Sequence, residues 1–310
     1  MKLLILTQKV AKNDPILGFF VNWIKAFSEK FEKITVICLE AGEYDLPGNV
    51  KVLSLGEEKL KIENSKLKIL AKLKYAWNFY KYIFKFRHDY DAVFVHMNQE
   101  YVILGWKFWK LWGKKIYLWR NHAHGDFFTR LAILVSDKVF YTSSQSFTAK
   151  FGKAVRMPAG IDTDFFKPDP SVARIPNSVL FLGRIAPVKK VMEFVEWAET
   201  KGFRKVTIAG PIGDKEYGEK VLSMLTPNMT YVGPVTQAAA LKLYQTHETY
   251  VNMTPAGSFD KTILEVAACG TRVKVENNDL KFMEGKTDAE LRDFVVENHS
   301  LKKLADKLAV

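Results

Sequence analysis

Short apolar runs alternate with longer stretches of helical periodicity through the first half of the chain. Runs typical of buried strands lie at 3–6, 34–39, 50–55, 92–96, 115–119 and 138–141. Stretches with apolar positions at helical spacing lie between most of them, at 19–31, 66–87, 101–112 and 127–135. Strands that alternate with helices in this way predict a parallel sheet with helices on both faces.

The alternation breaks once and then restarts. Residues 157–170 are rich in Pro, Gly and Asp, which indicates a linker. Beyond it, strands are predicted at 179–182, 205–209, 230–232 and 249–253, and helices at 191–200, 214–225, 236–245, 262–268, 288–296 and 301–308. We therefore predict an α/β chain of two doubly wound, Rossmann-like domains that face each other over a cleft. The expected parts are residues 1–157, a linker at 158–176 and residues 177–310, with the terminal helix a candidate to return to the first domain.

Length and composition agree with two cytoplasmic globular domains. The 310 residues are 48% hydrophobic and 26% charged, and no run of 18 apolar residues predicts a membrane span. The apolar start of the chain has no small-residue cleavage site and predicts a first strand rather than a signal peptide. The cysteines Cys38 and Cys269 lie far apart in apolar surroundings, so we expect buried free thiols in a reducing compartment.

One pair of segments in the second half carries candidate chemistry. The apolar strand at 179–182 runs directly into Gly183 and Arg184, and Lys189 follows five residues later. Further on, Ser258 and Phe259 open a predicted helix that places Glu265 two turns in. A strand that ends in glycine beside two fixed cations can hold a diphosphate, and a carboxylate can bind ribose hydroxyls. The pattern predicts a ligand that is a nucleotide diphosphate.

Five fragments of this half, in order and spacing, resemble the donor-binding half of the family 4 glycosyltransferases, which have the GT-B fold. They are Gly160 to Asp162 with 166–168, Gly183 to Lys189, 207–211, 231–235 and 258–270. The resemblance covers nearly the whole chain. It implies that Arg184 and Lys189 bind and stabilise the leaving diphosphate, that Glu265 binds the ribose and that Val235 lies against the base. It also implies retention of configuration, a UDP- or GDP-linked hexose as co-substrate, and neither a metal nor a cofactor.

One position departs from the family's pattern. The first glutamate of its E-x7-E motif, which contacts the transferred sugar, falls on Gly257. Asp260 and Lys261 are also unusual for this turn, where small or apolar residues are common. We include both among the donor-binding residues, and Asp260 is a candidate to take over contacts with the sugar.

The first half is expected to carry the acceptor. His122 and His124 follow the predicted strand at 115–119, and the carboxyl end of a strand in a doubly wound sheet opens toward the ligand. The resemblance places His122 near the donor sugar as a catalytic residue, with His124 beside it as a sugar or acceptor contact. The alternative is that both brace the loop. Gly18 begins a helix whose N-terminus can face the phosphates, although a single glycine can also serve only a turn.

The excess positive charge lies wholly in residues 1–160, which hold 26 Lys and Arg against 14 Asp and Glu. Residues 66–87 contain seven basic residues and no acidic one. A stripe at 69, 73, 76, 80 and 84 is predicted to pack on the core, which leaves other aromatic side chains outside it. The predicted membrane-binding residues are Lys68, Lys72, Lys74, Trp77, Lys81 and Lys85, and the helix at 101–112 adds an aromatic patch of Trp106, Trp109 and Trp112. Such a surface suits an anionic membrane; nucleic acid is the competing partner, but no nucleic-acid-binding motif is present.

These observations predict a retaining glycosyltransferase on the cytosolic face of a membrane, with a lipid-linked or glycan acceptor. One alternative is a sugar-nucleotide epimerase or hydrolase on the same fold, which would need a pair of carboxylates for acid–base chemistry. The other is a non-catalytic nucleotide-sugar-binding module, which the glycine at position 257 makes conceivable.

Overall fold

The computed structural model describes residues 1–56, 65–255 and 260–309, with the backbone alone given for 65–70. The chain divides into two compact units. Unit 1 comprises Met1–Met157 and Ala305–Val310, and unit 2 comprises Pro158–Leu304. Among the described residues, no helix combines the length and apolar character needed to cross a membrane.

Unit 1 contains a seven-stranded parallel sheet in the order β3-β2-β1-β4-β5-β6-β7. Its strands are β1 (Lys2–Val10), β2 (Lys33–Ala41), β3 (Val50–Ser54), β4 (Ala92–His96), β5 (Lys115–Trp119), β6 (Lys138–Tyr141) and β7 (Ala154–Arg156). The central strands are fully buried because their side chains are apolar on both faces, as expected when helices cover both sides.

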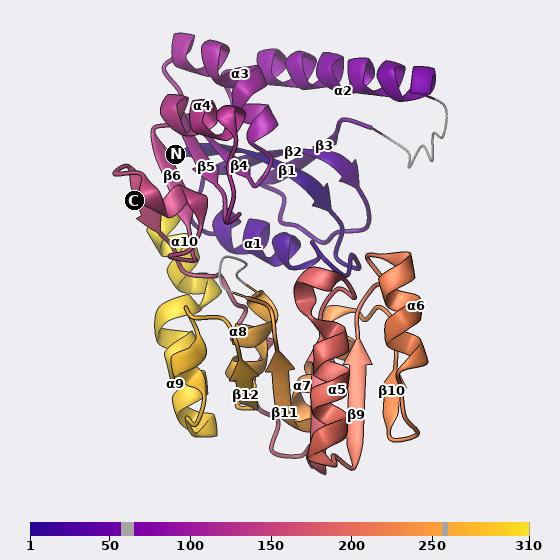
Figure 1. Cartoon of the computed structure of the whole chain (residues 1–310). Helices are drawn as coiled ribbons and strands as arrows, with labels where there is room; N and C mark the ends of the chain where they lie inside the picture. Colours follow the sequence, from indigo (N-terminus) through magenta and orange to yellow (C-terminus); the bar gives the residue numbers. More distant parts are fainter. Residues whose placement is uncertain (57–64, 256–259, 310) are drawn as a thin grey trace. The chain divides into compact units, whose positions relative to one another are not determined.

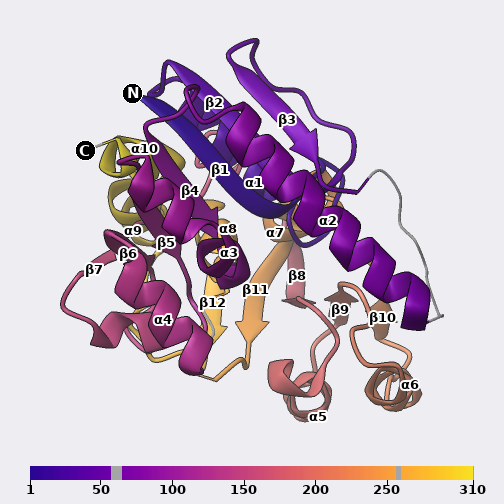
Figure 2. The ribbon, with the colours of Figure 1, turned by 90° about the horizontal axis from the view of Figure 1, so that it is seen from above.

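The described helices of this sheet's own chain segment are α1 (Phe19–Ser28), α2 (Ser65–Lys85), α3 (Gln99–Leu111), α4 (Phe127–Val135) and the 3-10 turn η1 (Phe147–Lys150). Figure 1 shows α2, α3 and α4 on one face of the sheet and α1 on the other, and Figure 2 shows the first three from above. On the α1 side, Trp23 packs edge-on against Trp119 with ring centroids 5.0 Å apart. Aromatic packing of this kind fixes the helix against the sheet.

Unit 2 contains a five-stranded parallel sheet in the order β10-β9-β8-β11-β12. Its strands are β8 (Ile175–Leu182), β9 (Lys205–Ala209), β10 (Met229–Tyr231), β11 (His247–Asn252) and β12 (Arg272–Val275). Its helices are η2 (Pro187–Lys189), α5 (Val191–Lys201), α6 (Lys215–Ser223), α7 (Gln237–Thr246), α8 (Lys261–Ala268), η3 (Lys281–Met283), α9 (Asp288–His299) and the start of α10 (Leu301–Leu308). Two separate apolar clusters, one with α7, α8 and α9 and one with α5 and α6, cover opposite faces.

The sequence pattern does not predict β7 or β12. Each is an edge strand of three or four residues, too short to give a periodic signal. In β12 only Val273 and Val275 are buried, between exposed Arg272 and Lys274. Short edge strands therefore escape the pattern although they complete the sheets.

The first part of residues 158–176, expected to form a linker, packs into unit 2 up to Phe166, whereas residues 167–171 are exposed. Ala159, Ile161 and Phe166 are each at most 2% exposed and belong to its apolar cluster. Ile161 also forms an isolated parallel bridge with Ser300. The apolar residues of this segment thus anchor it to unit 2. Cys38 and Cys269 are buried free thiols, as expected.

Candidate functional site

Three glycines lie at the carboxyl ends of neighbouring strands of unit 2: Gly183 after β8, Gly210 after β9 and Gly233 two residues after β10. The Gly210 N–H donates to the Gly233 carbonyl at 2.8 Å. A Cβ on Gly210 would lie 1.9 Å from the Gly183 oxygen, and its φ is +134°, so only glycine fits there. A Cβ on Gly183 would meet nothing closer than 3.5 Å. The residue that must be glycine is therefore Gly210. The fragment at 207–211 includes this residue, but Gly183 was singled out from the sequence instead.

Arg184 leaves this edge with an exposed side chain. A Cβ on Gly213 would lie 2.4 Å from the Arg184 Cδ, so the aliphatic part of the arginine crosses directly over this glycine. Among the described carboxylates, none forms an ion pair with its guanidinium group. The charge at the end of β8 is thus available to an anionic ligand.

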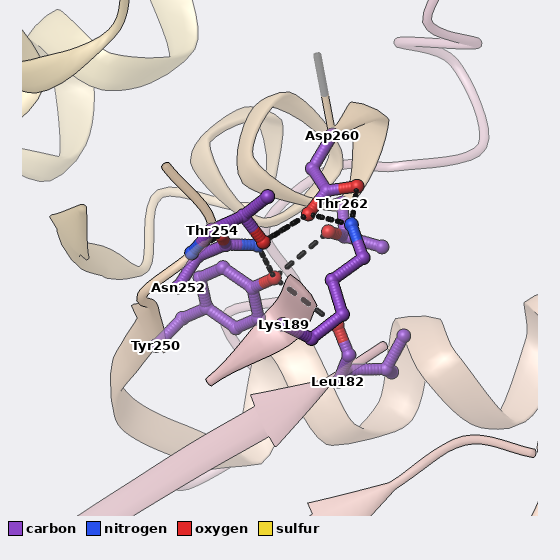
Figure 3. A network of polar contacts seen from close by, with 7 residues as sticks. All are labelled: Leu182, Lys189, Tyr250, Asn252, Thr254, Asp260 and Thr262. Atoms are coloured by element: carbon purple, nitrogen blue, oxygen red, sulfur yellow. Dashed lines mark hydrogen bonds and ion pairs between the residues drawn. The ribbon is translucent and has the colours of Figure 1, made fainter. Parts of the chain in front are cut away.

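Lys189 is placed differently from Arg184. It ends the turn η2 and is only 7% exposed. Its Nζ lies 2.5 Å and 2.6 Å from the two carboxylate oxygens of Asp260, at the N-terminus of α8 (Figure 3). The structure thereby brings together two of the predicted donor-binding residues, and the lysine charge is balanced within the protein.

Further polar groups hold Asp260 in place. Its Oδ2 also accepts from the Asn252 amide at 2.9 Å and the Thr254 hydroxyl at 2.8 Å. The Tyr250 hydroxyl accepts from the same Asn252 amide at 3.0 Å and lies 2.8 Å from the Thr262 hydroxyl (Figure 3). The network ties the end of β11 to the start of α8.

Sequence reasoning missed Tyr250, Asn252 and Thr254. Their two-residue spacing at the end of an apolar strand is the signal that could have revealed them, because it places them on one face.

Glu265 and Lys261 lie one turn apart on α8; each residue is partly exposed as a whole, but the ammonium nitrogen of Lys261 is buried. The Tyr244 hydroxyl donates to Glu265 Oε2 at 3.1 Å. Burial raises the pKa of Glu265, opposed by the charge of Lys261 and by this hydrogen bond. Burial lowers the pKa of Lys261, opposed by Glu265. Val235 is partly buried against the apolar cluster beside α8.

Ser258 and Phe259, predicted to bind the donor, lie outside the described residues, as does Gly257.

In unit 1, the loop after β5 is anchored at several points. The Asn121 side-chain oxygen accepts from the Thr142 N–H at 2.7 Å, and the His122 carbonyl accepts from the Phe147 N–H at 2.8 Å. The side chains of His122 and His124 are exposed. Desolvation and the charge of Arg120 lower the pKa of His122, so its imidazole is neutral at pH 7. A neutral imidazole can both donate and accept a hydrogen bond.

Arg120, the first residue after β5, was not singled out from the sequence. It is only 8% exposed, and its Nη1 is buried without a hydrogen-bond partner among the described residues. Desolvation lowers the pKa of this group, opposed by the charges of Asp126 and Glu100. An arginine is normally exposed or paired, so nothing in the sequence indicates this burial.

Gly18 lies immediately before α1 with a right-handed helical backbone. A Cβ there would lie 2.6 Å from the Asp14 carbonyl oxygen and 2.8 Å from the Lys12 carbonyl oxygen. The glycine therefore has a packing role, since it lets the preceding loop fold tightly against the helix start.

The predicted membrane residues lie along α2. Trp77 is 73% exposed, and Lys72, Lys74, Lys81 and Lys85 are exposed. The side chain of Lys68 lies outside the described residues.

The predicted stripe on α2 is confirmed at Tyr80, which packs against the apolar core, and is wrong at two other positions; the side chain of Ile69 lies outside the described residues. Leu73 is 61% and Phe84 38% exposed, whereas Phe79 and Ile83 form the buried contact. The helix has apolar side chains on more than one face, so periodicity alone did not identify the packed one. Trp109 of the expected aromatic patch is fully buried, because it packs over the bare backbone of Gly105.

Solved structures match this fold over nearly its whole length at low sequence identity. HepE of Anabaena, solved in complex with UDP, matches with a TM-score of 0.71 and 14% identity over 100% of this chain and 98% of that chain. AviGT4, a glycosyltransferase of avilamycin A biosynthesis, matches with a TM-score of 0.68 and 13% identity over 99% of this chain and 96% of that chain. Sucrose-phosphate synthase of Thermosynechococcus elongatus matches with a TM-score of 0.67 and 14% identity over 100% of this chain and 94% of that chain. No protein-family model and no curated protein sequence matches the chain. The two parallel sheets and these matches together show that the chain has the two-domain GT-B fold.

Proposed function

We propose that the protein is a retaining glycosyltransferase that moves a hexosyl group from a UDP- or GDP-linked sugar to an acceptor. The observation that carries the proposal is the placement of Arg184, Lys189 and the start of α8 at the carboxyl end of the unit 2 sheet. Doubly wound sheets bind nucleotides at this end. UDP bound to HepE, which has the same fold, supports this assignment.

The donor would be held by charge at one end and by hydrogen bonds at the other. Arg184 has no ion pair to a described carboxylate and can bind phosphate oxygens with two parallel hydrogen bonds. Among the described residues, the hydrogen bond from Tyr244 involves only Oε2 of Glu265, which leaves Oε1 to accept from a ribose hydroxyl. Val235 would lie against the base.

In the proposed reaction the bond between the sugar C1 and the diphosphate breaks, and the acceptor oxygen bonds to C1 with the same configuration. The acceptor proton leaves with the diphosphate. Negative charge develops on the leaving group, and the fixed Arg184 guanidinium stabilises it. His122, neutral at pH 7 because of its lowered pKa, can hydrogen-bond the sugar or the acceptor hydroxyl, with His124 as its neighbour.

We further propose that α2 places the enzyme on an anionic membrane, where a lipid-linked or glycan acceptor is found. Exposed Trp77 and Leu73 supply apolar contact, and the lysines around them supply charge. Each basic residue near such a surface contributes about 1 kcal/mol.

Incubation of the protein with a panel of nucleotide sugars tests the function, with thermal unfolding as the first readout. The expected result is a rise in melting temperature with one UDP- or GDP-sugar. Slow release of free sugar from that donor should then be detectable by NMR. The α-anomer released from an α-linked donor supports retention. An epimerised nucleotide sugar would favour the epimerase, and binding without any turnover would favour the binding module.

A further inference from the structure

Arg120 is a buried cation whose guanidinium group has no hydrogen-bond partner among the described residues. The residue directly follows β5 and is 8% exposed. No described residue forms a hydrogen bond or an ion pair with its guanidinium group, and Nη1 is fully enclosed. A guanidinium group carries five N–H donors, and nearly all buried arginines are paired.

The two nearby carboxylates do not take this role. Asp126 caps α4: its Oδ1 accepts from the Thr129 N–H at 2.7 Å and from the Thr129 hydroxyl at 2.8 Å. Its Oδ1 also accepts from the Gln99 amide at 3.4 Å. Glu100 is an exposed residue in the first turn of α3 and acts on Arg120 only through space. Both carboxylates favour the charged form of Arg120 through space, but neither accepts a hydrogen bond from its N–H groups.

The neighbourhood is otherwise suited to a ligand. His122 lies within the electrostatic reach of Arg120, and its loop is fixed to the end of β6 through Asn121. The carboxyl end of a parallel sheet is where doubly wound domains bind small molecules. A neutral hydroxyl could occupy some of the donors, but only an anion would also balance the desolvated charge.

We propose that Arg120 is the centre of an oxyanion-binding site in unit 1, which holds a phosphate or a carboxylate group through the paired N–H donors of Nε and Nη2, since Nη1 is enclosed by the protein. Within the function proposed above, on which this part of the inference rests, the oxyanion belongs to the acceptor. The acceptor would then be an anionic glycan or a phosphorylated lipid.

Thermal unfolding of the whole protein with inorganic phosphate or with acetate, at ionic strength held constant with chloride, tests the site. At about ten times the dissociation constant, the wild-type melting temperature is expected to rise by about 3 °C. Arg120→Met should lose this rise, yet melt in chloride at the same temperature as wild type or higher, because it removes an uncompensated charge. Arg87→Met, at an exposed arginine of the same unit, is the control and should keep the rise.

The two probes separate the sources: a larger rise with phosphate points to a phosphorylated acceptor, and a larger rise with acetate to a carboxylated glycan. The proposal is overturned if Arg120→Met responds to both anions like wild type, if it melts well below wild type in chloride, or if glycerol stabilises wild type where neither anion does.

UDP and GDP are titrated into the same variants. Failure of both nucleotides to bind wild type would count against the glycosyltransferase and leave the anion site standing, whereas intact nucleotide binding without an anion response would count against the anion site alone.

Discussion

The ammonium group of Lys189 lies 2.5 and 2.6 Å from the two oxygens of Asp260, and both side chains are largely buried, at 9% and 20% exposure. A nucleotide diphosphate that approaches Lys189 would therefore meet a cation whose charge is already compensated. Asp260 would therefore compete with the diphosphate for the ammonium group of Lys189.

Asp260→Asn should free this charge. Without ligand the variant should lose about 3 kcal/mol of unfolding free energy, because a buried lysine is left unpaired. It should bind a nucleoside diphosphate more tightly than wild type, and the gain should be smaller for the monophosphate. Calorimetric titration with UDP and UMP measures this. An equal loss of affinity for both would instead make Asp260 a brace that positions Lys189.

Arg184→Gln should weaken binding of the nucleoside diphosphate by roughly 10–100-fold, since a charged pair of hydrogen bonds to phosphate is lost. Turnover should fall further, because the guanidinium also stabilises the leaving group. Arg204→Gln is the matched control, since Arg204 is exposed and lies before β9, at the opposite end of the strand. If both variants behave alike, the phosphate does not bind at the end of β8.

Glu265→Gln should change how stability depends on pH. The folded-state pKa of Glu265 is raised, so the folded state favours the protonated carboxyl group. Its contribution is therefore fully present below the ordinary value of 4.5 and is lost as the pH rises through the folded-state pKa. Melting curves of wild type and variant, recorded from pH 4 upward, should diverge across this window. Parallel curves would show that Lys261 and Tyr244 cancel the effect of burial.

Gly210→Ala should destabilise unit 2 by more than about 3 kcal/mol, because the new methyl group would overlap the Gly183 oxygen at a backbone angle that L-residues avoid. Gly183→Ala is the control, since the space beside it is open to ordinary contact, and it should cost less than about 1 kcal/mol. Urea unfolding measures both. A similar cost for the two variants would mean that the strand ends can shift apart.

Replacement of Lys72, Lys74, Lys81 and Lys85 by Gln should abolish most binding to vesicles that contain anionic lipid, while nucleotide binding stays intact. Each lysine contributes about 1 kcal/mol at such a surface, and added salt screens it. The control changes the same charge in unit 2, at the exposed Lys201, Lys205, Lys242 and Lys281. Co-sedimentation at low and high salt measures vesicle binding. Equal losses of binding in both variants would show that net charge alone, and not the position of the lysines on α2, determines binding.

The order of helices and strands was predictable because long apolar runs and helical periodicity persist along the chain. The predicted bounds of α4 and β9 are those of the structure. Which side chains meet was harder to predict, since that depends on register and packing. The partnership of Lys189 with Asp260 joins residues 71 positions apart. The burial of Arg120 has no sequence signature, because only the surrounding fold desolvates it.

Helix α10 has a consequence for the order in which the protein is made. Its residues up to Leu304 belong to unit 2, while Ala305 and Leu308 are buried in unit 1, where Asp306 pairs with Lys30 at 2.6 Å. The last of these residues leaves the ribosome only after all of unit 2 has been synthesised. At about 5–20 residues per second, the first unit must wait on the order of 10–30 s for its final piece. During that interval the apolar surface that Ala305 and Leu308 cover stays exposed, which leaves the unfinished unit open to chaperones and prone to aggregation.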